Sequence, residues 1–381
     1  MSLLRSDRAA AAILLVAAAA GLVVANAPIG DVVIRFFSVH GGVGAVDLSL
    51  THWISDGLLA VFFFAVSVEL QFELTRGELR SARRAVQPAI AAAGGVVVPI
   101  VLYLAIAAGS GYARGWPIPT ATDVAFALGV LAVFGRGLPS GLRAFLLALA
   151  ILDDIVGIVL IAVLYAHGLQ LGMLVLAAVA VAAFGALSRA LGGRGTVAIA
   201  TAMGVLAVAA WVLTLLSGIH PTIAGVALGL VMSQRPALRV RHVLEPWING
   251  VVLPLFAFTA ALVPVPVGAT GVGAAFWAVL IALPVGKLVG IVAAAWIAQR
   301  TVGRHGEQLP FGDLVAAGAL GGIGFTVSLL LAGLAFSGAP EVRDQAVLGV
   351  LGGSVVALVA GSVLVSWRAR GYRLRSAQEE T

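Results

Sequence analysis

The sequence predicts an all-α, polytopic membrane protein with 12 transmembrane helices. Of its 381 residues, 61% are hydrophobic and only 10% are charged, whereas about a quarter of the residues in soluble domains carry a charge. Apolar stretches of about 20 residues, the length that spans the hydrocarbon core of a bilayer, recur along the whole chain. We therefore expect residues 1–381 to form a single integral membrane domain.

Each of the twelve apolar segments is taken as one helix. They begin near Ala9, Trp53, Val86, Trp116, Gly141, Gly172, Thr196, Gly218, Trp247, Gly273, Gly312 and Arg343. The first segment follows two arginines, as in a signal peptide, but its apolar run of about 18 residues exceeds the usual signal core of about 7–15. We expect it to be retained. The chain has no cysteine, which excludes disulfides and thiolate metal sites.

The distribution of arginine in the loops predicts the orientation. With the N-terminus inside, the outer loops hold only Arg35, Arg114 and Arg343, and the other arginines fall on inner segments. This asymmetry follows the positive-inside rule, so both termini are expected in the cytoplasm. Because the arginines are spread loop by loop, the net charge of +6 does not indicate a nucleic-acid partner.

Ionisable side chains inside the spans are the strongest functional signal. The chain's one lysine, Lys287, lies in the middle of the otherwise apolar run 276–297, where a cation costs roughly 2.5–3.5 kcal/mol on insertion scales. Asp153 and Asp154 lie midway along the span 141–165 and point about 100° apart on a helix. One of them can meet a lysine on a neighbouring helix while the other faces a water-filled cavity. We expect these groups to be paired, protonated or bound to a cation.

Two spans contain residues that weaken helix continuity. Residues 117–123 (PIPTATD) place prolines and threonines directly before Asp123, and residues 318–326 (GALGGIGFT) are dense in glycine. Unwound backbone in a membrane is tolerated only where it is buried in protein or lines a cavity. Interruptions at matching places in two halves indicate a transporter's binding site. Helices 3–5 (about 86–165) and 10–12 (about 273–368) are therefore candidate inverted repeats.

Six motifs, in order along the chain, resemble those of the NhaA-type sodium/proton antiporters. They are 56–63 (DGLLAVFF), 122–131 (TDVAFALGVL), 149–155 (LAILDDI), 253–258 (LPLFAF), 286–290 (GKLVG) and 322–326 (GIGFT). Six separated motifs in one order are far more specific than any one of them.

The resemblance implies that helices 4 and 11 are discontinuous and cross at mid-membrane. It also implies electrogenic exchange of cytoplasmic Na⁺ or Li⁺ for external H⁺ across the bacterial inner membrane, for sodium and pH homeostasis, without a cofactor. Carried over by position, Asp154 would be the main cation ligand and Asp153 its partner near Lys287. Asp123 would compensate the partial charges where half-helix ends meet. Thr122 and freed backbone carbonyls can supply further oxygen ligands.

Supporting or gating roles are expected at Asp56, Glu69, His220, Gly322, Gly324 and Thr326. Some of these positions allow two interpretations. Glu69 lies about 20 Å along the helix from Asp56 and would either attract cations at the cytoplasmic mouth or be a solvated helix end. His220 would either sense pH or be a hydrogen-bonded structural residue. Lys287 would either carry protons or only pair two helices.

Two positions depart from the family pattern. Members commonly place basic residues between two acids at the end of the second helix, but Glu69 and Glu73 are separated by none, and Arg241 precedes His242 where an acid often stands. We expect the transport function, but not its pH profile, to carry over. Residues 31–50 are a candidate outer β-hairpin through which the family forms homodimers, and the remaining expected partner is membrane lipid.

Two other classes of protein share some of these features. A sodium-coupled symporter of a small solute would have broken helices and a cation site, but also a polar cluster for its substrate, which the sequence lacks. An intramembrane aspartyl protease would need two aspartates, here Asp123 and Asp153, in a Gly-x-Gly-Asp-like context that neither has. We therefore expect a transporter and not an enzyme.

Overall fold

The computed structural model describes residues 6–44, 46–191, 196–266, 273–301 and 308–379. Within these ranges, ten helices are long and apolar enough to cross a membrane, and a bent pair of shorter helices raises the number to eleven. A further apolar helix, α10 (Thr222–Val231), is shorter than a full span. The prediction of an all-α polytopic membrane protein is confirmed, whereas the count of twelve stays a prediction. Arg5, Arg194 and Arg304, which lie on predicted inner segments, fall outside the described residues.

Contacts divide the chain into two compact units. Among the described residues, the first unit comprises 16–77 and 158–262, and the second comprises 6–15, 78–157 and 263–379. Two helices, α1 (Asp7–Ala25) and α7 (Ser140–Leu164), contribute to both units. Each unit therefore has its own packing and its own polar contacts.

The first unit begins with a short helix and a β-hairpin. After α2 (Gly30–Phe37), strands β1 (His40–Val43) and β2 (Val46–Ser49) pair antiparallel with His40 opposite Ser49. The hairpin is shorter than the expected segment 31–50, because the chain up to Phe37 is helical. The hydroxyl of Ser49 then accepts a hydrogen bond from the backbone N–H of His52, which caps the start of the next helix.

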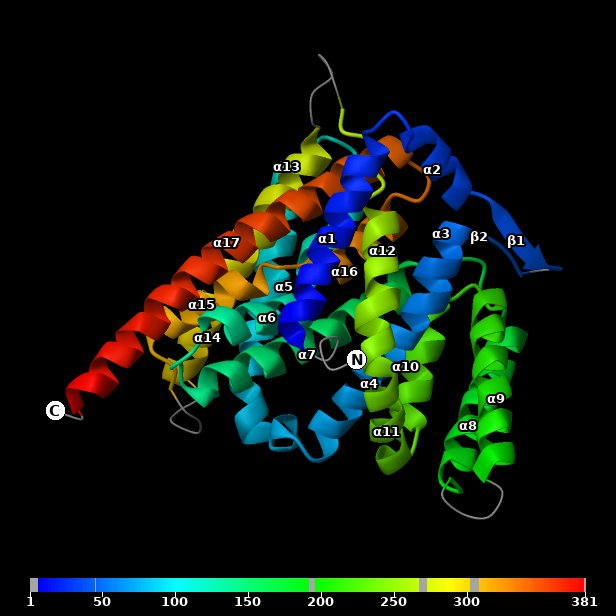
Figure 1. Ribbon diagram of the computed structural model, residues 1–381, viewed down its shortest axis with the longest axis horizontal. Helices are drawn as coiled ribbons and strands as arrows, with labels where there is room; N and C mark the ends of the chain where they lie inside the picture. Colours follow the sequence, from blue (N-terminus) through cyan, green and yellow to red (C-terminus); the bar gives the residue numbers. More distant parts are fainter. Residues whose placement is uncertain (1–5, 45, 192–195, 267–272, 302–307, 380–381) are drawn as a thin grey trace. The chain divides into compact units, whose positions relative to one another are not determined.

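The other helices of the first unit lie mostly in apolar segments of the sequence. They are α3 (Leu50–His52), a π-helical turn (Trp53–Leu58), α4 (Leu59–Thr75), α8 (Leu171–Ser188), α9 (Thr196–Leu216), α10, α11 (Gln234–Trp247), a second π-helical turn (Ile248–Val252) and α12 (Leu253–Ala260). Figure 1 shows α8 and α9 side by side, and α4 beside α10. The ninth helix begins at Gln234 and not near Trp247, because the arginine-rich α11 continues into the apolar α12. Because the first residues of α11 are mostly polar, hydropathy did not indicate a helix there.

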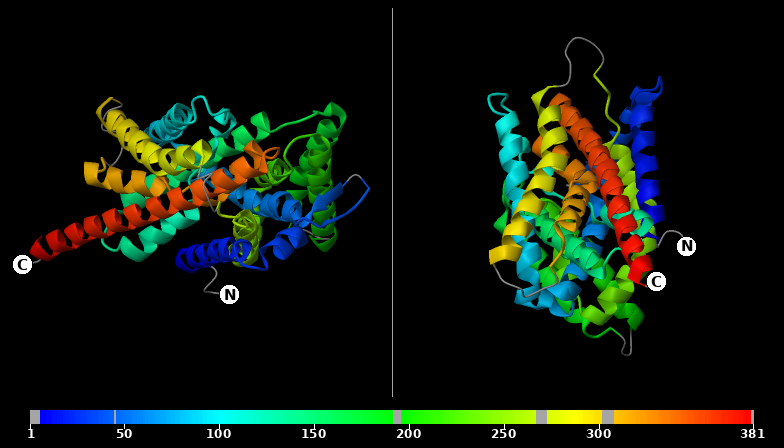
Figure 2. Two further views of the ribbon diagram at one scale, coloured as in Figure 1. Left: turned by 90° about the horizontal axis from the view of Figure 1, so that it is seen from above. Right: turned by 90° about the vertical axis from the view of Figure 1, so that its left-hand side faces the viewer.

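The second unit contains two sets of three helical segments. The first set is α5 (Ala82–Ile106), the span 113–134 that ends in α6 (Val124–Phe134), and α7. The second set is α13 (Ala274–Ile281) with α14 (Lys287–Thr301), then α15 (Phe311–Gly321) with α16 (Phe325–Ala335), and α17 (Pro340–Glu379). Figure 2 shows α17, in red, as a long straight helix that runs beside α13 and α15.

Both expected breaks are present in the second unit. The chain is extended from Ala121 to Asp123, between a 3-10 turn (Ile118–Thr120) and α6. Pro119 supplies no N–H for a continuous helix here. The helices α15 and α16 are bent by 46° at Gly322–Gly324. Thus the prolines and glycines interrupt the fourth and eleventh predicted helices at the expected places.

Close helix packing surrounds the start of α14. A Cβ added to Gly290 would overlap the carbonyl oxygen of Gly94 on α5, and one added to Gly94 would overlap that of Gly290. The two backbones are therefore too close for any side chain at these positions, as in small-residue contacts between membrane helices. A Cβ on Gly95 would lie 3.7 Å from Cδ of Lys287, so the lysine stem lies directly against α5.

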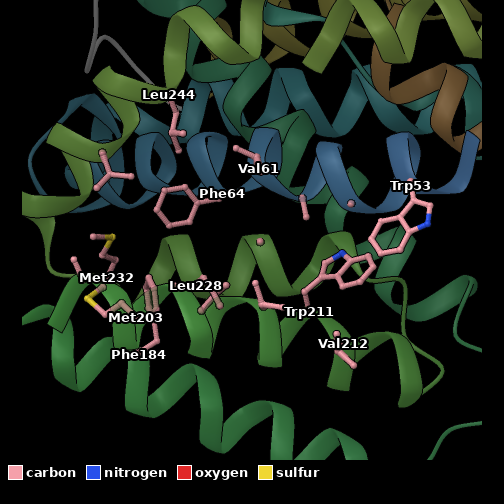
Figure 3. Close-up of a pocket in the computed structure, with 18 of the residues that line it drawn as sticks. Trp53, Val61, Phe64, Phe184, Met203, Trp211, Val212, Leu228, Met232 and Leu244 are labelled. Atoms are coloured by element: carbon pink, nitrogen blue, oxygen red, sulfur yellow. The ribbon is translucent and has the colours of Figure 1, made fainter. Parts of the chain in front are cut away.

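An apolar cavity of about 880 Å³ lies in the first unit. Figure 3 shows Phe64 on α4 facing Met203 and Phe184 across it, with Trp53 and Trp211 at one end. These two indoles are stacked with centroids 5.5 Å apart. Among the described residues, those that line the cavity are apolar or glycine, so none of them offers a charged side chain or a carboxylate to a cation.

Candidate functional site

Lys287 and Asp153 form a fully buried ion pair in the second unit. Nζ of Lys287 lies 2.6 Å from Oδ2 of Asp153, and both side chains are 0% exposed. Lys287 is the first residue of α14 and follows a π-helical turn (Ala282–Gly286) that contains Pro284. Such turns occur frequently at functional sites. The lysine thus contacts an acid on a neighbouring helix, and each charge offsets the other where neither side chain is exposed.

Thr122 links this ion pair to both broken spans. Its hydroxyl oxygen lies 2.7 Å from Oδ2 of Asp153 and 2.8 Å from the carbonyl oxygen of Gly321, the last residue of α15. One hydroxyl hydrogen can serve only one of these acceptors at a time. Thr122 therefore stands between a carboxylate of α7 and the C-terminal end of α15.

The second carboxylate oxygen of Asp153 is unusual. Oδ1 is buried and has no hydrogen-bond partner within the part of the chain that the structure describes. Buried polar atoms are nearly always hydrogen-bonded, so each exception needs a physical reason. An acceptor without a donor is suited to a cation or a proton, because either supplies the missing positive charge.

Asp154 is the next residue on α7. It is 8% exposed, against 1% for Asp153. Neighbouring residues on a helix point about 100° apart, so Asp154 does not share the direction in which Asp153 meets Lys287. The two acids therefore occupy different surroundings, as the sequence had indicated.

Asp123 caps two helices at once. Its Oδ1 accepts from the backbone N–H of Phe126 in α6, and its Oδ2 accepts from both the N–H and the hydroxyl of Thr326 in α16. Its own N–H donates to the carbonyl of Ile323 at 2.6 Å. The N-termini of α6 and α16 carry partial positive charge. One buried carboxylate thus compensates both and holds the two breaks together.

A side chain would have little room at the two glycines where the second break touches its neighbours. A Cβ on Gly324 would overlap the hydroxyl of Ser328 and lie 2.7 Å from Cδ1 of Leu283. A Cβ on Gly322 would lie 3.0 Å from Cα of Pro284. The bend between α15 and α16 therefore packs directly against the segment that precedes Lys287.

Asp56 and His220 lie in the first unit and contact each other there. Nε2 of His220 is 3.5 Å from Oδ1 of Asp56, and its Nδ1 is 2.7 Å from the hydroxyl of Thr222. The same Oδ1 accepts a hydrogen bond of 2.6 Å from Ser55. Burial lowers the pKa of His220, and the Asp56 carboxylate opposes that shift. His220 is thus a hydrogen-bonded residue that stays neutral more readily than a free histidine.

Glu69 also belongs to the first unit. Its Oε2 lies 2.6 Å from Nη2 of Arg241, and the two side chains are about one-third exposed. Arg241 is one of the positions at which the chain departs from the expected pattern. Arg241 pairs with this acid, and both interpretations of Glu69, as a cation attractor at the cytoplasmic mouth or as a helix end, stay predictions.

One buried acid escaped the sequence reasoning. Asp313, in the first turn of α15, is 0% exposed and pairs with Arg368 of α17, whose Nε lies 2.7 Å from its Oδ1. Acids are common in the first turn of a helix, where the dipole favours them, and they are often solvated. The signal was available: Asp313 is the only acid inside the segment 308–335, but nothing in the sequence indicated its partner.

Comparison with known proteins gives a match over nearly the whole chain. A family model described as Na⁺/H⁺ antiporter 1 matches residues 1–365. The chain belongs to the Na⁺/H⁺ antiporter 1 family. A relative from Clavibacter michiganensis, Na(+)/H(+) antiporter NhaA 2, is 54% identical over 98% of this chain and 93% of its own length. The NhaA antiporters of Tropheryma whipplei and Thermobifida fusca are 44% and 42% identical, over 96% and 97% of this chain and 95% and 94% of their own lengths.

Family membership agrees with the resemblance found in the six sequence motifs. It makes the chain a multi-pass membrane transporter and not an enzyme. The reaction of such an antiporter needs no organic cofactor, since the ions are its substrates.

Proposed function

We propose that Asp153 and Asp154 bind Na⁺ and protons in turn, at the point where the two broken spans meet. Thr122 and the carbonyl oxygen of Gly321 would complete the oxygen ligands, and Lys287 would be the counter-charge. The observation that carries this proposal is the buried Lys287–Asp153 pair, held beside the Thr122–Gly321 hydrogen bond. This arrangement brings the ionisable groups of Lys287 and Asp153 close to the carbonyl oxygen at the end of α15.

The oxygen atoms available here suit sodium. In transporters with broken helices, unwound carbonyls and the C-terminal ends of half-helices coordinate Na⁺. The carbonyl of Gly321 ends α15 and carries the partial negative charge of a helix C-terminus. Oδ1 of Asp153 is a further oxygen without a donor. A carboxylate that has bound a proton is a poor cation ligand, so sodium and protons compete for the same oxygens.

Lys287 has two roles that the contacts support. As a strut, it holds α14 to α7 through Asp153. As a proton carrier, it would lose its proton when sodium takes its place beside the carboxylate, since a buried lysine can deprotonate and an arginine cannot. If Asp154 and Lys287 each exchanged one proton, every cycle would move a net charge and transport would be electrogenic.

The arginine distribution supports a direction for the exchange. We place the chain in the bacterial inner membrane with both termini in the cytoplasm, because the outer loops of that arrangement hold few arginines. The antiporter would then expel cytoplasmic Na⁺ or Li⁺, driven by protons that enter from outside. Such exchange serves sodium and pH homeostasis.

The second unit supports the proposal of inverted repeats. It contains the same order twice: long helix, broken span, long helix. We infer that α5 to α7 and α13 to α17 are the two repeats, that α10 is the twelfth membrane helix, and that the breaks cross at mid-membrane. For the β-hairpin (His40–Ser49), we propose a role in a homodimer, with membrane lipid around both protomers.

Two other functions fit the structure less well. An aspartyl protease would need two aspartates that face a substrate, but both oxygens of Asp123 accept helix-capping hydrogen bonds. A sodium-coupled symporter would need a pocket with polar side chains for its solute, whereas the described residues that line the cavity of Figure 3 are apolar or glycine. The symporter is the stronger of the two, because it would also use a sodium site at broken helices.

The test is sodium-driven proton movement in everted vesicles or proteoliposomes, followed with a pH-sensitive dye. Na⁺ alone should dequench the dye in the parent protein. The Asp154→Asn and Asp153→Asn variants should lose this response. Asp344→Asn is the matched control, since its carboxylate lies in the same unit and pairs with Arg343 at 2.8 Å. A response that needs an added solute would indicate a symporter, and full exchange by Asp154→Asn would overturn the site.

A further inference from the structure

Both oxygens of the buried Asp313 carboxylate accept hydrogen bonds from side chains of one helix, α17. Arg368 donates from Nε to Oδ1 at 2.7 Å, and the hydroxyl of Tyr372 donates to Oδ2 at 2.7 Å. The two donors are four residues apart on α17 and so lie on one face of it. The guanidinium of Arg368 also lies 5.2 Å from the ring centre of Tyr372. We call Asp313, Arg368 and Tyr372 the α15 clamp.

The same helix also holds the start of the other half of the broken span. The backbone N–H of Phe325, the first residue of α16, donates to the hydroxyl of Ser354 at 3.2 Å. Ser354 and Arg368 are about 21 Å apart along α17. One straight helix therefore contacts the N-terminal ends of both α15 and α16, as the course of α17 in Figure 2 allows.

The end of α17 that carries the clamp is closely packed. A Cβ on Gly312 would lie 3.0 Å from Nε of Arg368. Gly137, in the loop that follows α6, has a φ of +96°, and a Cβ there would lie 2.9 Å from Cγ of Arg373. The same stretch of α17 thus touches the beginning of α15 and the loop after the first broken span.

A direct line of contacts joins the clamp to the proposed ion site. Asp313 and Gly321 stand near the two ends of α15, about 12 Å apart. The carbonyl of Gly321 accepts from Thr122, whose hydroxyl also contacts Asp153. A helix of this length moves as one piece, so an axial shift at Asp313 displaces the Gly321 carbonyl by nearly the same distance.

We propose that the α15 clamp is a positioning element for ion exchange. It fixes the axial position of α15, and thereby the distance between the Gly321 carbonyl and Thr122 at the site where sodium binds. Asp313, Arg368 and Tyr372 touch no ion themselves. This inference rests on the proposed ion site, and it adds residues that no motif of the chain indicates.

A purely structural clamp would behave differently. Breaking a buried ion pair destabilises the fold wherever it lies, so loss of stability alone does not distinguish the two roles. A positioning role changes the sodium concentration for half-maximal exchange, because the ligand geometry changes. A structural role lowers the amount of folded protein and hence the maximal rate, without changing half-saturation.

The experiment measures exchange rate against Na⁺ concentration in proteoliposomes, normalised to the amount of folded protein. Asp313→Asn should raise half-saturation about five- to tenfold, at the lower end of usual couplings between separate sites, with the maximal rate within about twofold of the parent. Tyr372→Phe removes one hydroxyl and keeps the ion pair, so it should give a smaller rise in the same direction. If Asp313→Asn does not fold, Tyr372→Phe tests the proposal in its place.

The control variant and the failure outcomes are separable. Asp344→Asn also changes one acid to an amide, on α17 itself, and should keep the parent half-saturation. If Asp313→Asn and Tyr372→Phe keep it too while Asp154→Asn is inactive, the clamp proposal is overturned and the ion site stands. If Asp154→Asn exchanges normally, the proposed ion site has failed instead, and with it the basis of the clamp's role.

Discussion

Replacing Lys287 by alanine should destabilise the protein strongly. Asp153 is 0% exposed, and its ion pair of 2.6 Å would be lost. Removing one partner of a buried pair costs about 3–5 kcal/mol, because the remaining charge has neither water nor a counter-charge. For a protein of this size, that loss lowers the melting temperature by something on the order of 5–10 °C.

The size of this effect should depend on pH. A buried carboxylate without a cation can take up a proton, which removes the charge and most of the penalty. The stability lost by Lys287→Ala should therefore be larger at alkaline than at acidic pH. Thermal unfolding of the purified variant, followed by fluorescence-detected size exclusion across this range, measures the difference directly.

Two further variants make the measurement specific. The double variant Asp153→Asn, Lys287→Ala removes both charges and should recover most of the lost stability. Arg343→Ala breaks an exposed pair with Asp344, whose side chains are 42% and 16% exposed, and such pairs contribute at most about 1 kcal/mol. The reasoning is refuted if Lys287→Ala melts with the parent at alkaline pH, or if the double variant is no more stable than the single one.

The same variant separates the two roles of Lys287 in transport. If Lys287 carries protons, Lys287→Ala should be less electrogenic and keep some sodium/proton exchange through Asp154. If Lys287 is a strut, the variant should lose thermal stability and keep its charge movement per ion. Current and dye measurements on the same proteoliposomes distinguish these results.

Three other predictions concern the helix breaks and the first unit. Asp123→Ala should lose two helix caps, at about 1 kcal/mol each. Gly324→Ala should cost about 1–3 kcal/mol by overpacking and impair exchange, whereas Gly333→Ala meets no atom within 4 Å and should change neither. Burial lowers the pKa of His220 below its ordinary 6.5, so the unfolded chain protonates first and stability falls as pH drops below that value. His220→Gln should abolish this loss.

Thermal unfolding measures the stability changes in all three, and the proteoliposome assay measures exchange by Gly324→Ala and Gly333→Ala. If Asp123→Ala has the same melting temperature as the parent, the double cap is contradicted. If Gly324→Ala has the same melting temperature as Gly333→Ala, the close packing at the bend is contradicted. For His220, the melting temperature of the parent should fall more between pH 7.5 and 5.5 than that of His220→Gln. Equal falls in the two proteins would show that this histidine does not contribute to the acid sensitivity.

Local chemistry explains what was predictable about the fold. Hydropathy alone indicates the spans, because a helix of about twenty apolar residues matches the thickness of the hydrocarbon core of a bilayer. The two breaks follow from single residues, since Pro119 has no N–H and Gly322 and Gly324 lower helix stability wherever they stand. These effects act over one or two helical turns, so they can be derived from the sequence without knowledge of the neighbours.

Effects that depend on a neighbouring element were missed. Asp313 had the sequence signature of a solvated acid at a helix start, but it is buried because Arg368, 55 positions later, covers it. Nothing in the sequence near Glu69 indicated its pairing with Arg241, 172 positions later. The start of α11 was missed because its arginines lower the mean hydropathy of a segment that is nevertheless helical.

By itself, the sequence determined that the chain spans a membrane, where its helices break, and that Lys287 and two adjacent acids lie inside the spans. The family resemblance implied that Asp153 lies near Lys287 and that Asp123 lies where half-helix ends meet. Only the tertiary structure shows the contacts themselves: Lys287 donates to Asp153, 134 positions away, and Asp123 accepts hydrogen bonds from a helix start 203 positions away. The physical reason is range. Hydropathy and helix propensity act between near neighbours along the chain, whereas the pairing of buried charges depends on which helix faces pack together.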